Sequence, residues 1–214
     1  MSPALLIFDC DGTLIDSERL YNRAWASRLA LLGLDWAPMD VARRLMGRPI
    51  PDCLDLVGQA LGRAVPDDFL PGVFAETDRL FASEGLKKTD GIDEALVALP
   101  QPKCVASSGL FEDVRDNLAS TGLLPHFGVE RLFVAAMVKH GKPAPDLFLL
   151  AAERMGAKPQ DCVVIEDSVP GILGARAAGM RVLAYCAQHN DAGALVAAGG
   201  EPFRHMRELP RLIG

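Results

Sequence analysis

The sequence lacks the features of secreted, membrane-spanning and nucleic-acid-binding proteins. Its apolar runs are far shorter than the roughly 20 residues that a helix needs to cross a bilayer, and its start, MSPALLIFD, has no basic region before an apolar segment. Basic residues are not in excess, because 22 Lys and Arg stand against 28 Asp and Glu for a net charge of −6. An acidic balance argues against a nucleic-acid or membrane partner. We therefore expect a soluble, cytoplasmic protein with neither partner.

Cysteine pairs are also missing. The five cysteines are scattered and odd in number, and no two form a Cys-x-x-Cys motif. They are typical of small buried hydrophobic side chains in a reducing compartment. With 214 residues, half of them hydrophobic, the chain can bury a core without disulfides or zinc. The length suits one large domain, or one domain with a smaller one inserted.

Short apolar runs alternate with helical patterns along most of the chain. Runs typical of buried parallel strands lie at residues 4–8, 103–109, 131–136, 162–167 and 181–185. Helical patterns lie between them at 111–120, 144–155 and 169–178. This alternation predicts an α/β fold with right-handed βαβ units in a doubly wound, Rossmann-like parallel sheet.

Residues 18 to about 87 break the alternation. Four helical patterns follow one another there, at 18–32, 38–46, 50–61 and 67–83, and no strand pattern separates them. We therefore predict an α/β catalytic core made of residues 1–16 and 88–214. An all-helical cap, residues 17–87, is inserted after the first strand.

Polar side chains follow several predicted strands, at the edge where doubly wound sheets bind ligands. At these ends lie Asp9 with Asp11, Ser107 with Ser108 and Gly109, and Glu166 with Asp167, while Lys142 begins a helix. Carboxylates can hold Mg²⁺, which removes the repulsion between an attacking carboxylate and a phosphate. Lysine, hydroxyl and backbone N–H groups can hold the remaining phosphate oxygens. The set predicts a Mg²⁺ site that handles a phosphate.

Each feature alone has a plainer interpretation. Asp9 and Asp11 could belong to a turn, and Lys142 to the surface. An EF-hand would need a ligand at Ile7, inside the apolar strand, and a P-loop would need Ser or Thr at Pro143. The conjunction of all the features, in this order, indicates phosphate chemistry.

That conjunction resembles the haloacid dehalogenase superfamily, in its branch with a helical cap, over the whole chain. The matching motifs are FDCDGTL at 8–14, VASSG at 105–109, GKPAPD at 141–146 and VIEDSVPG at 164–171. The resemblance implies a phosphoric monoester hydrolase that acts through an aspartyl-phosphate. Because a second aspartate stands at Asp11, carbon–halogen chemistry is not expected.

The resemblance implies a role for each motif residue. Asp9 would be the nucleophile, and Asp11 the general acid and base with its carbonyl on Mg²⁺. Ser107 and Lys142 would be catalytic residues that hold the phosphate, helped by Ser108 and Gly109. The metal would be held by Asp9, Asp11 and Asp167, with Glu166 close by, directly or through water.

Within the family, the sequence is similar to sugar-phosphate phosphatases, the 6-phosphogluconate phosphatase type in particular. The alternative is a β-phosphoglucomutase-like phosphosugar mutase. Tyr21 and Ile50 stand where that mutase has a histidine and an arginine, which favours hydrolysis.

The cap is expected to choose the substrate, a small phosphate ester, in a monomeric enzyme. Gly47, Arg48 and Tyr21 are candidate substrate-binding residues. Alternatively, the basic residues near Gly47 form only a solvated helix face. Trp25, one turn after Tyr21, is expected to pack in the cap core.

Overall fold

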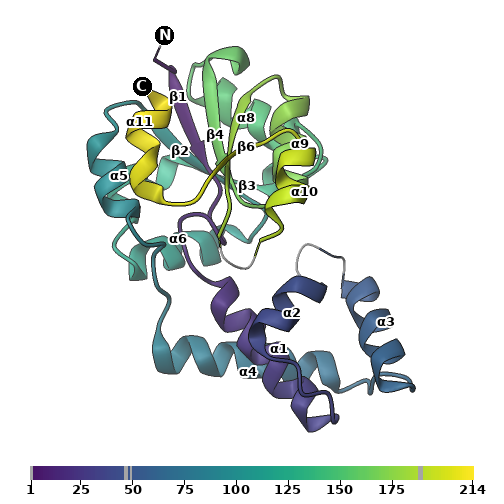
Figure 1. Ribbon diagram of the computed structural model, residues 1–214. Helices are drawn as coiled ribbons and strands as arrows, with labels where there is room; N and C mark the ends of the chain where they lie inside the picture. The colour runs from purple at the N-terminus through teal and green to yellow at the C-terminus, as the bar shows by residue number, and fades with distance from the viewer. Residues whose placement is uncertain (1, 46–47, 49, 188–189) are drawn as a thin grey trace. The chain divides into compact units, whose positions relative to one another are not determined.

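The computed structural model describes residues 2–45, 48, 50–187 and 190–214, and the chain forms two compact units (Figure 1). One unit contains Lys87–Gly214 together with the chain up to Asp16, and the other contains Ser17–Leu86. Among the described helices, none combines the length and apolar character needed to cross a membrane. All five cysteines are buried and free, as predicted.

The larger unit is built on a six-stranded sheet in the order β3-β2-β1-β4-β5-β6, with every pairing parallel. The strands are β1 (Leu5–Phe8), β2 (Lys103–Ser107), β3 (Leu132–Val134), β4 (Cys162–Glu166), β5 (Arg181–Tyr185) and β6 (Glu201–Phe203). The first five confirm the predicted runs. The sixth was not predicted, because its sequence Glu-Pro-Phe is short and carries a proline, which only an edge strand tolerates.

Helices cover both faces of this sheet (Figure 1). The helices are α5 (Ile92–Ala98), α6 (Phe111–Ser120), α7 (Leu124–Phe127), α8 (Asp146–Arg154), α9 (Val169–Ala177), α10 (Ala192–Ala197) and α11 (Leu209–Ile213). Short 3₁₀ turns occur at η1 (Val129–Arg131), η2 (Ala135–Met137), η3 (Pro159–Asp161) and η4 (Met206–Glu208). The arrangement confirms the predicted doubly wound α/β fold.

Strand β1 lies at the centre of the sheet and is buried along its whole length. Leu5 and Ile7 belong to the apolar cluster under α8, α9 and α10. Phe8 meets Phe127 of α7 edge-to-face, with ring centroids 5.8 Å apart. Because alternate side chains point to opposite faces, a strand covered on both sides must be apolar throughout. This is why the run at 4–8 was recognisable.

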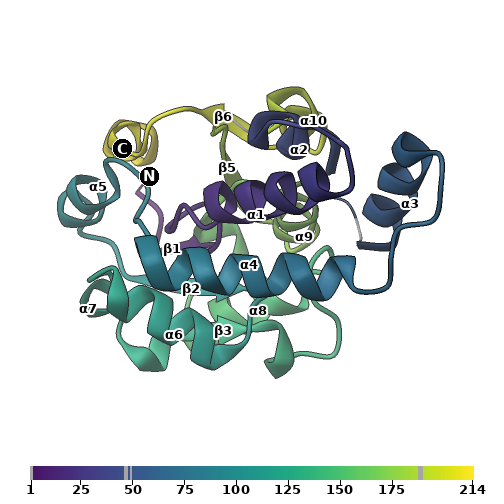
Figure 2. The same cartoon turned by 90° about the horizontal axis from the view of Figure 1, so that it is seen from below.

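The smaller unit is all-helical over its described residues, with α1 (Glu18–Leu31), α2 (Pro38–Leu45), α3 (Ile50–Leu61) and α4 (Phe69–Glu84). Helices α1 and α4 lie side by side (Figure 2). The unit has its own apolar core, which includes Leu20, Leu29, Val57 and Val73. Trp25 packs against this core and meets Phe69 edge-to-face at 5.4 Å, as predicted.

Candidate active site

The carboxyl ends of β1, β2 and β4 bring the predicted core residues to one edge of the sheet. Asp9 follows β1, and its N–H donates to the carbonyl of Ile165 at 2.9 Å, so the backbone still runs beside β4 at this point. The side chain of Asp9 is buried, with the residue 7% exposed. A carboxylate this buried requires compensation, and it receives it from Lys142.

Lys142 bridges two carboxylates that come from different strands. Its Nζ donates to Asp9 Oδ1 at 2.5 Å and to Glu166 Oε1 at 2.7 Å. The side-chain exposures are 4% for Lys142, 10% for Asp9 and 0% for Glu166. Nζ also lies 5.2 Å from the ring centroid of Phe148, on α8. The ammonium group is therefore an interior charge held at one place, not a surface lysine.

Glu166 is fixed by the start of α9. Its Oε2 accepts from the N–H of Asp167 at 2.8 Å, and from the N–H and hydroxyl of Ser168 at 2.7 and 2.8 Å. The Ser168 oxygen in turn accepts from the N–H of Gly171 at 3.1 Å and caps the helix. Protein donors thus contact both oxygens of Glu166, and its position relative to Lys142 is fixed.

Because Gly171 has no side chain, the carboxylate of Glu166 can occupy the space beside it. A Cβ at this position would lie 1.7 Å from Glu166 Oε1, although the helical backbone itself would accept alanine. We expect Gly171→Ala to destabilise the fold by about 1–3 kcal/mol, because the buried carboxylate must move. Urea unfolding measures this loss, and phosphatase assays should show a lower kcat.

A matched control for this substitution lies in α3. A Cβ on Gly58 has its nearest neighbour at 3.4 Å, the carbonyl oxygen of Arg63. Gly58→Ala should therefore be neutral or stabilise by up to about 1 kcal/mol, as helix propensity favours alanine. Equal stability of the Gly171→Ala and Gly58→Ala proteins would contradict the packing of Glu166 described above.

Asp167, the neighbour of Glu166, faces the loop after β1. Its Oδ1 accepts from the Thr13 hydroxyl at 3.1 Å, and its Oδ2 lies 3.3 Å from Asn190 Nδ2. Gly12 has φ +83°, and a Cβ there would lie only 2.2 Å from Asp167 Oδ2. Only glycine combines this left-handed backbone with so close an approach. The loop that carries Asp9 and Asp11 is thus pressed against Asp167.

The end of β2 and the turn after it position the hydroxyl group of Ser107. Ser107 is buried, and its Oγ accepts from the N–H of Gly109 at 3.0 Å. The Ser107 proton is therefore directed away from Gly109 and can be donated elsewhere. Asp11 Oδ2 lies near this turn, 3.8 Å from the position that a Cβ on Gly109 would take. Ser108 is exposed.

Negative charge dominates the electrostatics of this edge. The pKa of Asp9 is raised to about 8, because burial and the carboxylates of Glu166 and Asp11 together outweigh the opposing effect of Lys142. Burial also disfavours the charged form of Lys142, but Asp9 and Glu166 outweigh it and hold its pKa above the usual range. Lys142 therefore balances two buried carboxylates, those of Asp9 and Glu166.

The donor chemistry of this cluster fits Mg²⁺. Asp9, Asp11 and Asp167 offer the hard oxygen ligands that this ion prefers. Across the described residues, no three acidic, histidine or cysteine side chains already converge as a complete cage. Mg²⁺ commonly keeps waters and binds substrate oxygens, so an incomplete protein cage suits it.

The candidate residues of the cap belong to the helical unit. Tyr21, on α1, is 37% exposed and meets the ring of Phe81 at 5.4 Å. Arg48 is exposed, and its Nε donates to the carbonyl of Arg44 at 2.9 Å. Gly47 lies outside the described residues. The core candidates thus gather at one sheet edge, and the cap candidates remain predictions.

Three residues that hold the site were not predicted as part of it. Ser168 and Gly171 fix Glu166, and the N-cap pattern of a serine before a helix was the available signal. Asn190 donates to the carbonyl of Asp167 at 2.8 Å and follows it by 23 residues. No local pattern marks such a contact.

A model of the haloacid dehalogenase-like hydrolase family matches residues 3–179. The chain belongs to this family. The predicted resemblance is therefore confirmed, and with it the assignment of the protein as a hydrolase. The EF-hand interpretation is excluded, because Ile7 lies fully buried within β1.

Relatives within the haloacid dehalogenase-like family match almost the whole chain. The 6-phosphogluconate phosphatase of Escherichia coli is 32% identical over 97% of this chain and 93% of its own length. A phosphorylated carbohydrates phosphatase of Thermotoga maritima is 34% identical over 91% of this chain and 90% of its own. A haloacid dehalogenase-like protein of unknown function from Agrobacterium tumefaciens has a TM-score of 0.91 at 33% identity, covering 98% of this chain and 97% of that one.

A second solved structure carries ligands. The family hydrolase from Deinococcus radiodurans, solved with bound phosphate and sodium, has a TM-score of 0.87 at 29% identity. The match covers 98% of this chain and 94% of that one.

Proposed function

We propose that this protein is a Mg²⁺-dependent phosphatase that hydrolyses a small phosphorylated metabolite, a sugar phosphate or sugar-acid phosphate. The observation that carries the proposal is the buried contact between Lys142 and Asp9, with the Ser107 hydroxyl and further carboxylates at the same sheet edge. A nucleophile, a cation for the phosphate and the ligands for a metal are thus supplied by one constellation.

Asp9 is proposed as the nucleophile. Its carboxylate oxygen forms a bond to phosphorus, and the ester bond between phosphorus and the substrate oxygen breaks, which leaves an aspartyl-phosphate. Lys142 and the Ser107 hydroxyl hold the phosphate oxygens, because the hydroxyl already accepts from Gly109 and is left to donate. Lys142 reaches the phosphate from a position that Glu166 fixes.

Asp11 is proposed as the general acid and base. It gives a proton to the departing substrate oxygen, and then takes one from the water that attacks the aspartyl-phosphate. Its carboxylate lies near the Ser107–Gly109 turn, where the phosphate would be held. Hydrolysis returns Asp9 and releases inorganic phosphate.

Asp9, the carbonyl of Asp11 and Asp167 are proposed to hold Mg²⁺, with Glu166 positioned behind Lys142. When bound, the ion supplies positive charge that offsets repulsion between the carboxylate and the phosphate. The pKa of Asp9, raised by burial and further by the carboxylates of Glu166 and Asp11, is what a nearby cation would offset, and this supports the assignment.

The substrate class rests on the relatives and on the division of the chain. Relatives named as phosphatases of 6-phosphogluconate, phosphorylated carbohydrates and fructose 1-phosphate match 82–97% of this chain. The core constellation addresses only the phosphate. We therefore assign the choice of sugar to the helical unit, with Tyr21 and Arg48 as candidates, in a monomeric enzyme.

A panel of sugar phosphates and sugar-acid phosphates tests this function. We expect release of inorganic phosphate from at least one ester with Mg²⁺ present, and its loss when EDTA removes the metal. Restoration by added Mg²⁺ is the control for damage by the chelator. Conversion of glucose 1-phosphate without release of phosphate would instead indicate a mutase, and no turnover of any ester would contradict the proposal.

A further inference from the structure

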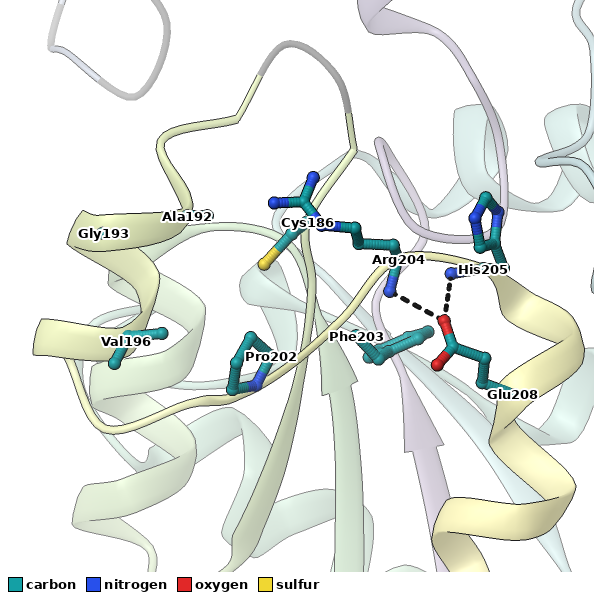
Figure 3. A pocket seen from close by; sticks show the side chains of 9 residues that line it. All are labelled: Cys186, Ala192, Gly193, Val196, Pro202, Phe203, Arg204, His205 and Glu208. Atoms are coloured by element: carbon teal, nitrogen blue, oxygen red, sulfur yellow. Dashed lines mark hydrogen bonds between the residues drawn. The ribbon is translucent and has the colours of Figure 1, made fainter.

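A groove of about 730 Å³ lies at the carboxyl end of β5 and of the edge strand β6 (Figure 3). Val196, Pro202 and Phe203 line it with apolar surface, and the thiol of Cys186 borders it. Pro202 is exposed, and Val196 is 48% exposed, so the apolar wall is open to a ligand. A cavity of this volume suits a molecule of drug or cofactor size.

Arg204 supplies positive charge to this groove. Its side chain extends from the end of β6 toward Cys186 (Figure 3). Its guanidinium makes no hydrogen bond or ion pair within the described parts of the chain. Arg181 and Arg207, in the same unit, each pair with a carboxylate at 2.6 and 2.8 Å. The charge of Arg204 therefore remains available.

The carboxylate of Glu208, which also lines the groove, accepts hydrogen bonds from the backbone. One of its oxygens accepts from the N–H groups of Arg204 and His205, at 3.0 and 2.8 Å. The other lies 3.7 Å from Arg211. These contacts fix the loop after β6 and direct the Glu208 oxygens to the backbone and to Arg211. The groove therefore presents the Arg204 guanidinium beside an apolar wall.

We propose that this groove binds a small organic anion. Its flat apolar body would lie on Val196 and Pro202, and its carboxylate, sulfonate or phosphate would pair with Arg204. A guanidinium is suited to such groups because it can donate two parallel hydrogen bonds to them. None of the residues that line the groove belongs to the constellation around Asp9. The groove is thus a second ligand site, distinct from the proposed phosphatase site.

Fluorescence titration with 8-anilinonaphthalene-1-sulfonate tests the proposal on the full chain. N-phenyl-1-naphthylamine, its neutral counterpart, is the matched probe. We expect the anion to bind the wild-type protein at least about tenfold more tightly than the neutral probe, since only the anion can accept charge-assisted hydrogen bonds from Arg204. Excess inorganic phosphate with Mg²⁺, added to occupy the catalytic constellation, should leave this binding unchanged.

Two substitutions test the charged part and the apolar part of the groove separately. Arg204→Ala should remove the preference for the anion, whereas Arg154→Ala, at an exposed arginine on α8, should leave it intact. Val196→Trp should block both probes by filling the groove. Circular dichroism and thermal unfolding check that each protein is folded.

Equal binding of the anion to the wild-type and Arg204→Ala proteins would overturn the proposal, as would displacement of the probe by phosphate with Mg²⁺.

Discussion

Replacing Asp9 with asparagine is expected to lower the rate of phosphate release by about 10⁴-fold or more, as loss of a catalytic nucleophile does in other hydrolases. An amide cannot form the bond to phosphorus. Among the described residues, Glu166 is the other carboxylate that contacts Lys142, and the start of α9 holds it in place. Steady-state release of phosphate from the best ester of the panel measures the effect, in the presence of Mg²⁺.

The control for this substitution must separate chemistry from folding. Asn has nearly the shape of Asp, and Lys142 keeps Glu166 as a partner, so the Asp9→Asn protein should remain folded in circular dichroism. Asp161→Asn, at an exposed acid beside β4, should retain wild-type activity. Activity within tenfold of wild type in the Asp9→Asn protein would remove Asp9 from the proposed nucleophilic role.

The sequence identified the core of the site because parallel sheets place ligands at one predictable edge. Strands buried on both faces must be apolar, so a change to aspartate, serine or glutamate marks the strand end. This reasoning located Asp9, Ser107 and Glu166 correctly at the ends of β1, β2 and β4. This reasoning did not locate β6, because an edge strand can be short and need not be an apolar run.

The partners within the site could not be read from the sequence. Lys142 follows Asp9 by 133 residues and precedes Glu166 by 24, and nothing local indicates that one ammonium group bridges both. Such contacts depend on the sheet order, which places β1 beside β4 although most of the chain lies between them. The types of residue at the site could be predicted from the sequence, but which of them pair depends on the order of the strands in the sheet.

Glu166 and Asp167 show most clearly that side-chain partners could not be predicted from the sequence pattern. Glu166 and Asp167 are equivalent as a sequence pattern, and both were predicted near the metal. In the structure Glu166 turns toward Lys142 and the start of α9, whereas Asp167 turns toward Thr13 and the loop after β1. The difference arises because Glu166 is the last residue of β4 and Asp167 the first of the following loop. Adjacent residues at such a point face different neighbours.

Removing the bridging charge is expected to have the largest effect on stability. In Lys142→Met, the carboxylates of Asp9 and Glu166 lose the ammonium group that compensates them, while their side chains are 10% and 0% exposed. Breaking a buried ion pair from one side costs about 3–5 kcal/mol of unfolding free energy. Urea unfolding without Mg²⁺ measures this cost, and Lys158→Met, at an exposed lysine, is the matched control.

The pH dependence of this loss has a defined sign. The pKa of Asp9 is raised to about 8 by burial even though Lys142 lowers it, so the substitution should raise that pKa further. The folded variant then binds more protons than the unfolded chain, whose aspartate has a pKa near 3.8. The stability of both proteins therefore falls as pH rises from the unfolded pKa toward the folded one. The deficit of Lys142→Met should grow once pH passes the wild-type value of about 8, so that it is larger near about pH 9.5 than near about pH 7.

A double substitution decides whether the loss comes from uncompensated charge or from lost packing. Glu166→Gln removes one of the two buried charges that Lys142 balances, at nearly constant volume. If charge is the cause, the Lys142→Met/Glu166→Gln protein should be more stable than Lys142→Met alone, with a coupling of about 0.5–3 kcal/mol. Additive losses that do not change with pH would show instead that Lys142 contributes packing against Phe148, and that its charge is not required for folding.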